Sequence, residues 1–534
     1  MILSVINDKK RETTTTMANT ETNHSENNKR IAKNTLLLYV RMLFSTLVSF
    51  YTSRVVLNTL GVEDFGIYNV VGGVIAMIGI LNGAMSVSVQ RFLNFELGAG
   101  DNKKLRQTFS MSLNIYALFA LVFVVLTETI GVWFLNTHLL IPQERLLAAN
   151  YVFQFSIFGM VFFLLSTPYN AAIIAHERMD FYAYTSIFDV LVKLAIVYLL
   201  VVISFDKLIG YGLFLTGATC LGALVSYIFC KRHFMECRYM LYWDKSLFGQ
   251  LFSYFSWNLF GSASTLVKGE GLNILLNMFF NPAVNGARGI AYSINNVVMQ
   301  FFNNFYAAVR PQIVKYYAQG DRESMLDLVF KSTKYSFFLC LIVSLPVLIE
   351  APYLVYLWLG QTPEYTVTFA RLIVVISIVD ALAYPIMTAA HATGKIKLYQ
   401  FVVGMITIMN IPVSYCVLKY VRTDPVVVYA VSLALAVIAF VVRLWIVKRL
   451  VNFSIRLYFR TVVLRILMLS ALSVPLPLGL HLILGNGFIS SAVVIIVSVV
   501  SSCILIYALG MSSTERTVVV NAARNKIKQY GIGR

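Results

Sequence analysis

The residues best able to bind a ligand or do chemistry are charged side chains that lie inside long apolar stretches. An ion in hydrocarbon is costly unless it faces water, a partner or a ligand. Arg41 begins a stripe of polar residues at helical spacing, and Lys268 ends a second such stripe. Cations in these places can offset the desolvation of a phosphate group. The candidate substrate-binding residues are therefore Arg41, Lys268, Arg288 and Arg54.

Some of these cations have a simpler interpretation. Arg54 and Arg288 lie near the ends of apolar stretches, as do Arg371 and Arg465, and long basic side chains there can reach the membrane interface. A single Arg or Lys can also pair with an acid on a neighbouring helix. Both alternatives stay open at this point.

Four acidic residues in apolar stretches are candidates for coupling to a proton or cation: Glu128, Glu350, Glu270 and Asp380. A structural role for Glu128 and Glu350 is equally consistent with the sequence. Asp380 has no evident partner. Asp189 and Lys193 stand four residues apart, which predicts an ion pair on one helix face.

Other catalytic chemistry is scarce. The sequence contains no phosphate-binding G-x-x-x-x-G-K-[ST] loop, and its six cysteines lack the spacing of metal ligands. We expect free thiols, no metal, no cofactor and no enzymatic activity.

The composition determines which elements hold these residues. Of 534 residues, 58% are hydrophobic and 13% are charged, against about 25% in ordinary globular proteins. The mean hydropathy is +0.74, which excludes a water-soluble protein. We predict an all-α polytopic membrane protein with about fourteen spans. The predicted spans are 35–57, 69–90, 109–134, 149–174, 185–203, 209–230, 250–279, 286–309, 332–358, 368–390, 399–419, 425–447, 461–482 and 489–510.

The positions of the basic residues predict the orientation. The net charge is +18, and most Lys and Arg residues fall in alternate loops and in the two tails. The intervening loops hold only Arg145, Lys207, Lys419 and Arg422. The positive-inside rule then places both termini in the cytoplasm, so topology explains the charge without nucleic acid. The outer loops are short, which disfavours a membrane-embedded glycan polymerase or ligase.

An internal repeat divides the chain. Gly66 recurs as Gly286 and Gly100-Asp101 as Gly320-Asp321, about 220 residues later, and Glu128 and Pro168 recur similarly as Glu350 and Pro385. This offset carries span 1 onto span 7, so the two copies are parallel, as in transporters built from two rocking halves. The predicted parts are a disordered cytoplasmic tail (1–34), an N-lobe (35–230), a linker (231–249), a C-lobe (250–447), two further spans (461–510) and a basic tail (511–534).

Several of these motifs carry a family resemblance. The stretch 34–58, the turn Leu60-Gly61 to Phe65-Gly66-Ile67-Tyr68, the Gly100-Asp101 loop and the stretch 168–179 resemble polysaccharide (Wzx-type) flippases. These belong to the multidrug/oligosaccharidyl-lipid/polysaccharide (MOP) exporter superfamily. The resemblance implies two six-helix lobes of the MATE type plus two C-terminal helices, with helices 1, 2, 7 and 8 around a central cavity.

The resemblance also implies a function. Such a flippase moves an undecaprenyl-pyrophosphate-linked oligosaccharide, an O-antigen or capsule repeat unit, to the outer leaflet of the bacterial cytoplasmic membrane by alternating access. The expected partners are that lipid-linked substrate, membrane lipids, and a polysaccharide polymerase with its assembly proteins. The protein itself is expected to be a monomer. A drug or organic-cation antiporter and a lipid II flippase remain alternatives, although an organic cation favours acidic rather than basic walls.

Overall fold

The computed structural model is all-helical over the residues that it describes. It describes the backbone of residues 2–520 except 140, 281, 486, 514, 518 and 519. Side chains are described from residue 30 onward within that range, except those of 50, 53, 54, 57, 62, 69, 70, 72–81 and 282. The chain divides into two compact units, Met1–Phe252 with Ala307–Pro311, and Ser253–Tyr306 with Gln312–Arg534.

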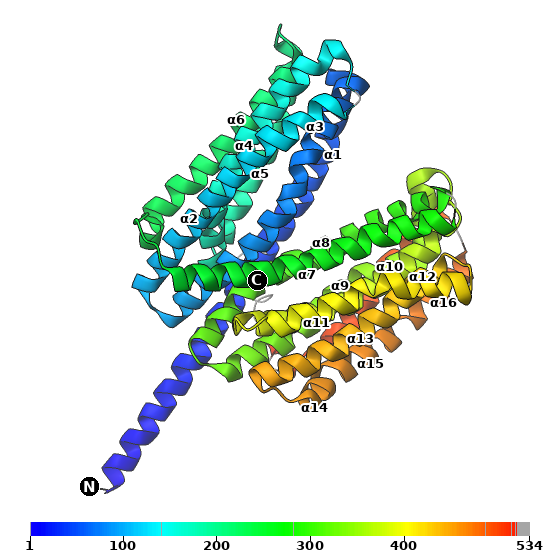
Figure 1. The fold of residues 1–534 in the computed structure, drawn as a ribbon. Helices are drawn as coiled ribbons and strands as arrows, with labels where there is room; N and C mark the ends of the chain where they lie inside the picture. The colour runs from blue at the N-terminus through cyan, green and yellow to red at the C-terminus, as the bar shows by residue number, and fades with distance from the viewer. Residues whose placement is uncertain are drawn as a thin grey trace, which may run out of the picture. The chain divides into compact units, whose positions relative to one another are not determined.

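The first unit contains the helices drawn in blue to blue-green in Figure 1. They are α1 (Ile2–Ala99), α2 (Asn102–Leu126), the π-turn η1 (Thr127–Gly131), α3 (Val132–Thr137), α4 (Gln143–Ala175), α5 (Met179–Val202), α6 (Lys207–His233) and the short turn η2 (Met235–Cys237). Helix α4 packs against α1, α2 and α6, so it forms the centre of this bundle.

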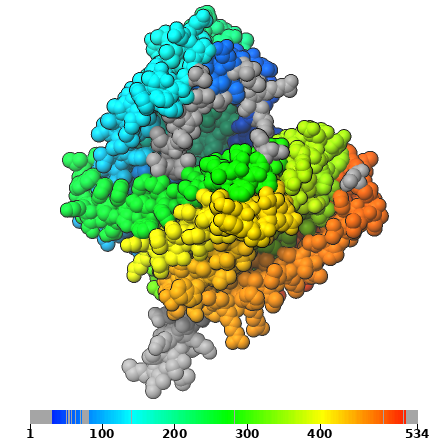
Figure 2. Space-filling view, turned by 45° about the vertical axis from the view of Figure 1, so that its right-hand side comes forward, coloured from blue at the N-terminus to red at the C-terminus, as the bar shows by residue number. Residues whose placement is uncertain are grey.

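The second unit contains most of α7 (Lys245–Phe279) and the helices that follow. These are α8 (Pro282–Ala318), α9 (Arg322–Leu359), α10 (Thr366–Ala392), α11 (Lys397–Ile408), α12 (Asn410–Tyr420), α13 (Val426–Val451), α14 (Ile455–Tyr458), η3 (Phe459–Val463), α15 (Leu464–Ser473), α16 (Pro475–Leu484), α17 (Phe488–Leu505) and η4 (Ile506–Gly510). Helix α10 packs against both α9 and α13. The yellow and orange residues, which belong to α11 to α16, form a continuous surface on the face shown in Figure 2.

The fold class predicted from the sequence is confirmed. Each of the fourteen predicted spans lies, to within a residue, inside one helix or a run of consecutive helices, and most of these helices extend several residues beyond the predicted span. Among the described residues, eleven helical segments are long and apolar enough to cross a membrane; α7 and α8 are not among them. Two predicted spans form the single element α1, which is kinked at Gly61, where φ is 82°. The backbone of α1 also runs through the predicted tail, most of whose side chains lie outside the described set, so the tail stays a prediction.

The repeated Gly-Asp pairs form the same local structure twice. Gly100 and Gly320 have φ values of 73° and 79°, which suit a residue without a Cβ after a helix end. The next residue then caps the following helix: the carboxylates of Asp101 and Asp321 accept the backbone N–H of Lys104 and Ser324, both at 3.0 Å. The internal repeat is thus visible in the turns that begin α2 and α9.

A missing backbone hydrogen bond in α9 is replaced by hydrogen bonds from a charged side chain. Pro352 has no N–H, so it cannot bond to the carbonyl of Leu348 one turn earlier. The guanidinium of Arg371 on α10 donates to that carbonyl at 2.8 Å and to the carbonyl of Ile349 at 3.3 Å. Arg371 of α10 therefore binds freed backbone carbonyls of α9. This is a third possible role for Arg371, besides reaching the membrane interface or pairing with an acid.

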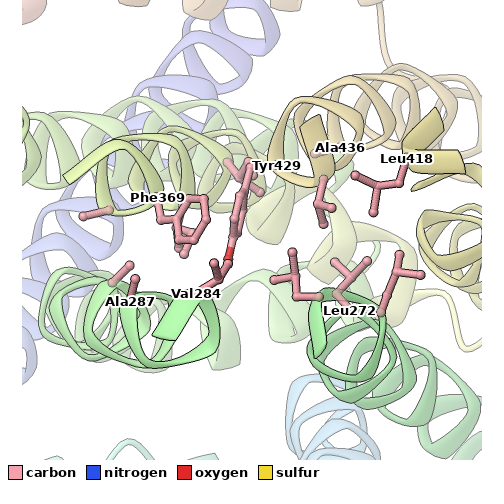
Figure 3. Close-up of a cluster of buried hydrophobic side chains, with 14 residues drawn as sticks. Leu272, Val284, Ala287, Phe369, Leu418, Tyr429 and Ala436 are labelled. Carbon is pink, nitrogen blue, oxygen red and sulfur yellow. The ribbon is translucent and has the colours of Figure 1, made fainter. Parts of the chain in front are cut away.

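One apolar core of the second unit joins α7, α8, α10, α12 and α13. In Figure 3 the ring of Tyr429 lies beside that of Phe369 with its hydroxyl end toward Val284, and Leu272 and Ala436 continue the cluster. The rings of Phe369 and Tyr429 have centroids 4.5 Å apart. This packing fixes α10 and α13 beside α7, and these three helices carry the charged residues described next.

Candidate functional site

Three charged side chains lie within electrostatic range of one another inside the second unit. Lys268 on α7 lies within electrostatic range of Asp380 on α10 and Arg443 on α13. Arg443 Nη1 lies 3.5 Å from Asp380 Oδ1, and the Arg443 side chain is only 16% exposed. We call Lys268, Asp380 and Arg443 the charged cluster. It has two positive charges and one negative charge, so it leaves one positive charge uncompensated.

Hydroxyl groups on α10 and on the neighbouring helices α8 and α11 lie near the charged cluster. Tyr384 and Tyr399 lie within electrostatic range of Asp380 and Arg443. One turn beyond Tyr384, Thr388 shares a hydrogen bond with the hydroxyl of Tyr306 on α8.

A separate amide network joins α11 to α7 and to the last turn of α10. Gln400 on α11 donates to Asn258 Oδ1 on α7 at 3.0 Å, and its amide nitrogen lies 3.4 Å from His391 Nε2. Surplus positive charge near tyrosine hydroxyls can bind an anion that also carries hydroxyls.

Arg41 occupies a separate place in the first unit. Its guanidinium lies over the ring of Tyr182 on α5, 4.9 Å from the ring centroid, and Nη1 lies 3.5 Å from Ser186 Oγ. It forms no ion pair with an acid among the described residues. Arg41 is therefore a half-buried cation held by an aromatic face and a hydroxyl.

Arg288 has backbone and aromatic partners. It donates to the carbonyl of Gly269 on α7 at 2.6 Å and lies over the ring of Tyr292, 4.7 Å from its centroid. These contacts fasten α8 to α7 and are those of a structural residue, although they do not test a role in binding. The side chain of Arg54 lies outside the described residues, so its candidacy stays a prediction.

The remaining acidic candidates differ in their surroundings. Glu128 is exposed in η1 and accepts a hydrogen bond from Gln154 Nε2 at 3.0 Å. Glu270 is exposed on α7. Asp189 and Lys193 form the predicted i,i+4 ion pair at 2.7 Å. None of these carboxylates joins the charged cluster.

Glu350 is the most deeply buried of the four acidic candidates. His481 Nδ1 on α16 lies 2.8 Å from Glu350 Oε1, and Ser491 Oγ on α17 donates to Glu350 Oε2 at 2.6 Å. Glu350 therefore fastens the two C-terminal spans, which have no counterpart in the repeat, to α9.

An ion pair fastens the other end of the same helices. Lys334 Nζ on α9 lies 2.9 Å from a carboxylate oxygen of Glu515, beyond η4. Burial raises the pKa of Glu515, but the backbone N–H of Ser512 and the ammonium of Lys334 outweigh it and hold the pKa of Glu515 below its usual value. Polar contacts therefore hold the C-terminal spans to α9 at both ends.

An arginine that the sequence interpretation treated only as a loop charge joins three helices of the first unit. Arg145 Nε on α4 donates to Asp64 Oδ1 at 2.8 Å, and Nη1 donates to Asp206 Oδ2 at 2.5 Å. Burial raises the pKa of Asp206, but the bonds from Arg145 and from the backbone N–H groups of Ile209 and Leu208 hold that pKa below its usual value. We call Asp64, Arg145 and Asp206 the loop clamp.

Sequence reasoning also missed Arg443. It lies in a predicted span, and Asp380, noted as lacking a partner, was the signal that a cation had to lie nearby. The two residues are far apart in sequence, and only the packing of α10 against α13 brings them together.

Comparison with known proteins identifies the fold. No protein-family model and no curated protein matches this chain. Solved structures do match. A MATE protein in the straight conformation has a TM-score of 0.68 at 13% identity, covering 80% of this chain and 97% of that one. An outward-facing multidrug resistance MATE family transporter of the MOP superfamily has a TM-score of 0.68 at 12% identity, covering 80% and 96%.

A third match comes from Pyrococcus furiosus. It is a MOP superfamily transporter described as having a binding pocket of reverse polarity, with a TM-score of 0.67 at 13% identity, and the match covers 80% of this chain and 96% of that one. At these identities the likeness shows the fold: this chain has the fold of MATE transporters of the MOP superfamily.

Proposed function

We propose that this chain, with its MATE-type fold, is a transporter that moves an undecaprenyl-pyrophosphate-linked oligosaccharide between the leaflets of a bacterial cytoplasmic membrane by alternating access. Both termini are cytoplasmic in this proposal, and the lipid-linked sugar is the cargo. The Wzx-like sequence motifs support the choice of cargo, and the polysaccharide polymerase remains a predicted partner.

The observation that carries the proposal is the charged cluster. Pyrophosphate is an anion whose desolvation must be offset, and the uncompensated positive charge of Lys268 and Arg443 with Asp380 supplies that offset. The nearby hydroxyls of Tyr384 and Tyr399 match the hydroxyls of a sugar. Arg41 adds a second cation in the other repeat copy, without a paired acid among the described residues.

A drug or organic-cation antiporter is the second candidate, because Asp380 is a carboxylate among aromatic rings and is 39% exposed. A multidrug resistance transporter is also among the structural matches. A cationic substrate, however, has to compete with Lys268 and Arg443 for the carboxylate of Asp380. The basic surplus therefore favours the anionic cargo.

The test is transfer of a fluorescent lipid-linked oligosaccharide in proteoliposomes that contain the full chain. We expect Lys268→Ala to slow transfer at least tenfold and Lys268→Arg to retain most of it, because charge rather than shape binds the pyrophosphate. Lys193→Ala is the matched control, since Lys193 is already neutralised by Asp189. Unchanged glycolipid transfer in Lys268→Ala, together with altered export of a cationic dye, would refute the proposal in favour of drug antiport.

A further inference from the structure

An apolar groove runs along the first unit, and none of the candidate residues above lines it. Its volume is about 470 Å³, within the range of ligand pockets, and it is open on one side. Its walls come from three helices: Leu113 and Ala117 of α2, Phe162 and Leu165 of α4, and Cys220 and Ala223 of α6. Almost all the lining is apolar, so an apolar chain is the occupant that it suits.

One end of the groove is polar. Tyr227, Tyr239 and Asn114 lie there. Asn114 fastens the segment that follows η2: its amide accepts the hydroxyl of Tyr239 at 2.9 Å and donates to the carbonyl of Tyr242 at 2.8 Å. This end of the groove is therefore built by side chains that are tied to one another.

A cation stands just beyond this polar end. Lys231, in the last turn of α6, donates to the hydroxyl of Tyr227 at 3.1 Å and remains exposed. A tyrosine hydroxyl and an ammonium side by side are donors for a phosphate oxygen. The groove thus combines an apolar channel with an anion-binding end.

The dimensions match one leaflet of a bilayer. From Cys220 to Lys231 helix α6 rises about 16 Å, at ~1.5 Å per residue. Half of a hydrocarbon core about 30 Å thick is about 15 Å. A lipid whose chain fills the groove therefore has its phosphate at the level of Lys231, where a membrane surface would lie.

We propose that this groove binds one acyl chain of an anionic phospholipid, with the lipid phosphate on Lys231 and Tyr227. The lipid comes from the leaflet at the basic end of α6. Its site is separate from the charged cluster and does not depend on which cargo the protein carries.

The test counts lipids that stay bound to the full-length protein by native mass spectrometry after extraction from phosphatidylglycerol and phosphatidylcholine bilayers. We expect one retained phosphatidylglycerol per chain. Ala223→Phe should abolish retention because it fills the groove, and Lys231→Gln should weaken it about fivefold. Leu221→Phe, on the exposed face of the same helix, and Arg232→Gln, which removes the same charge, are the matched controls and should retain the lipid.

A second readout uses Cys220, which is half-buried in the groove. Phosphatidylglycerol should slow its alkylation by a maleimide several-fold, while the exposed Cys416 of the same protein reacts at an unchanged rate. Two results would overturn the proposal: equal retention of both phospholipids, or retention that survives Ala223→Phe.

Discussion

Glu128 and Glu350 occupy matching positions in the sequence repeat but have different surroundings. Glu350 is buried beneath α16 and α17, where His481 and Ser491 bind its two oxygens. Glu128 is exposed and accepts one hydrogen bond from Gln154. The two C-terminal spans make the difference, since they cover only the second copy.

We predict that Glu350→Ala costs about 2 to 4 kcal/mol of folding free energy, because it leaves the polar atoms of His481 and Ser491 without their buried partner. Thermal unfolding of the purified protein in detergent would measure the loss. Glu128→Ala is the repeat-matched control and should change the unfolding temperature little. Equal losses in the two variants would contradict the structural role of Glu350.

At the level of single residues, the sequence indicates which charges lie in apolar stretches but not what they touch. The i,i+4 pair of Asp189 and Lys193 was predictable because both residues share one helix. The partners of Asp380 and Glu350 come from helices distant in sequence, and no local spacing signals them. Only tertiary packing places Arg443 and His481 beside these acids.

The elements follow more directly from the sequence. Long apolar segments between charged loops predict fourteen spans, all of which fall within helices, and eleven helical segments of the described residues are long and apolar enough to cross a bilayer. The irregularities inside helices were less accessible. The sequence shows Pro352, but it does not show that Arg371 binds the carbonyl that this proline frees.

The turns before α2 and α9 give a prediction at this scale. Gly320→Ala should destabilise the protein by about 1 to 2 kcal/mol, because φ at this residue is 79° and a Cβ is disfavoured there. Gly289→Ala is the control: Gly289 lies inside α8 with open space around it, so the change should be neutral or stabilising by up to about 1 kcal/mol. Similar unfolding temperatures for the two variants would count against the left-handed turn.

For the molecule as a whole, two carboxyl groups outside the spans connect stability to pH. Asp206 of the loop clamp and Glu515 both have pKa values below their usual ones. A depressed pKa in the folded protein means that the stabilisation is complete above the pKa of the unfolded chain. It is lost as the pH falls through the folded-state pKa.

We therefore expect the unfolding temperature to fall as the pH is lowered below about 4, near the pKa of an unperturbed Asp or Glu. Arg145→Gln should lower the unfolding temperature at neutral pH and flatten this acid dependence, because it removes the donor that depresses the pKa of Asp206. Lys207→Gln, next to Asp206 in the chain, controls for the loss of a positive charge. A variant that keeps the full acid dependence would show that Arg145 does not set it.

The fastening at Glu515 has a practical consequence for anyone who attaches a fluorescent reporter to this protein. The carboxylate that binds Lys334 lies after η4, outside the last apolar helix. A fusion joined directly at Gly510 would remove that carboxylate and leave a nearly buried ammonium on α9 uncompensated. Such a fusion would weaken the attachment of the C-terminal spans to α9, although a hydropathy plot would suggest Gly510 as a safe place to join it.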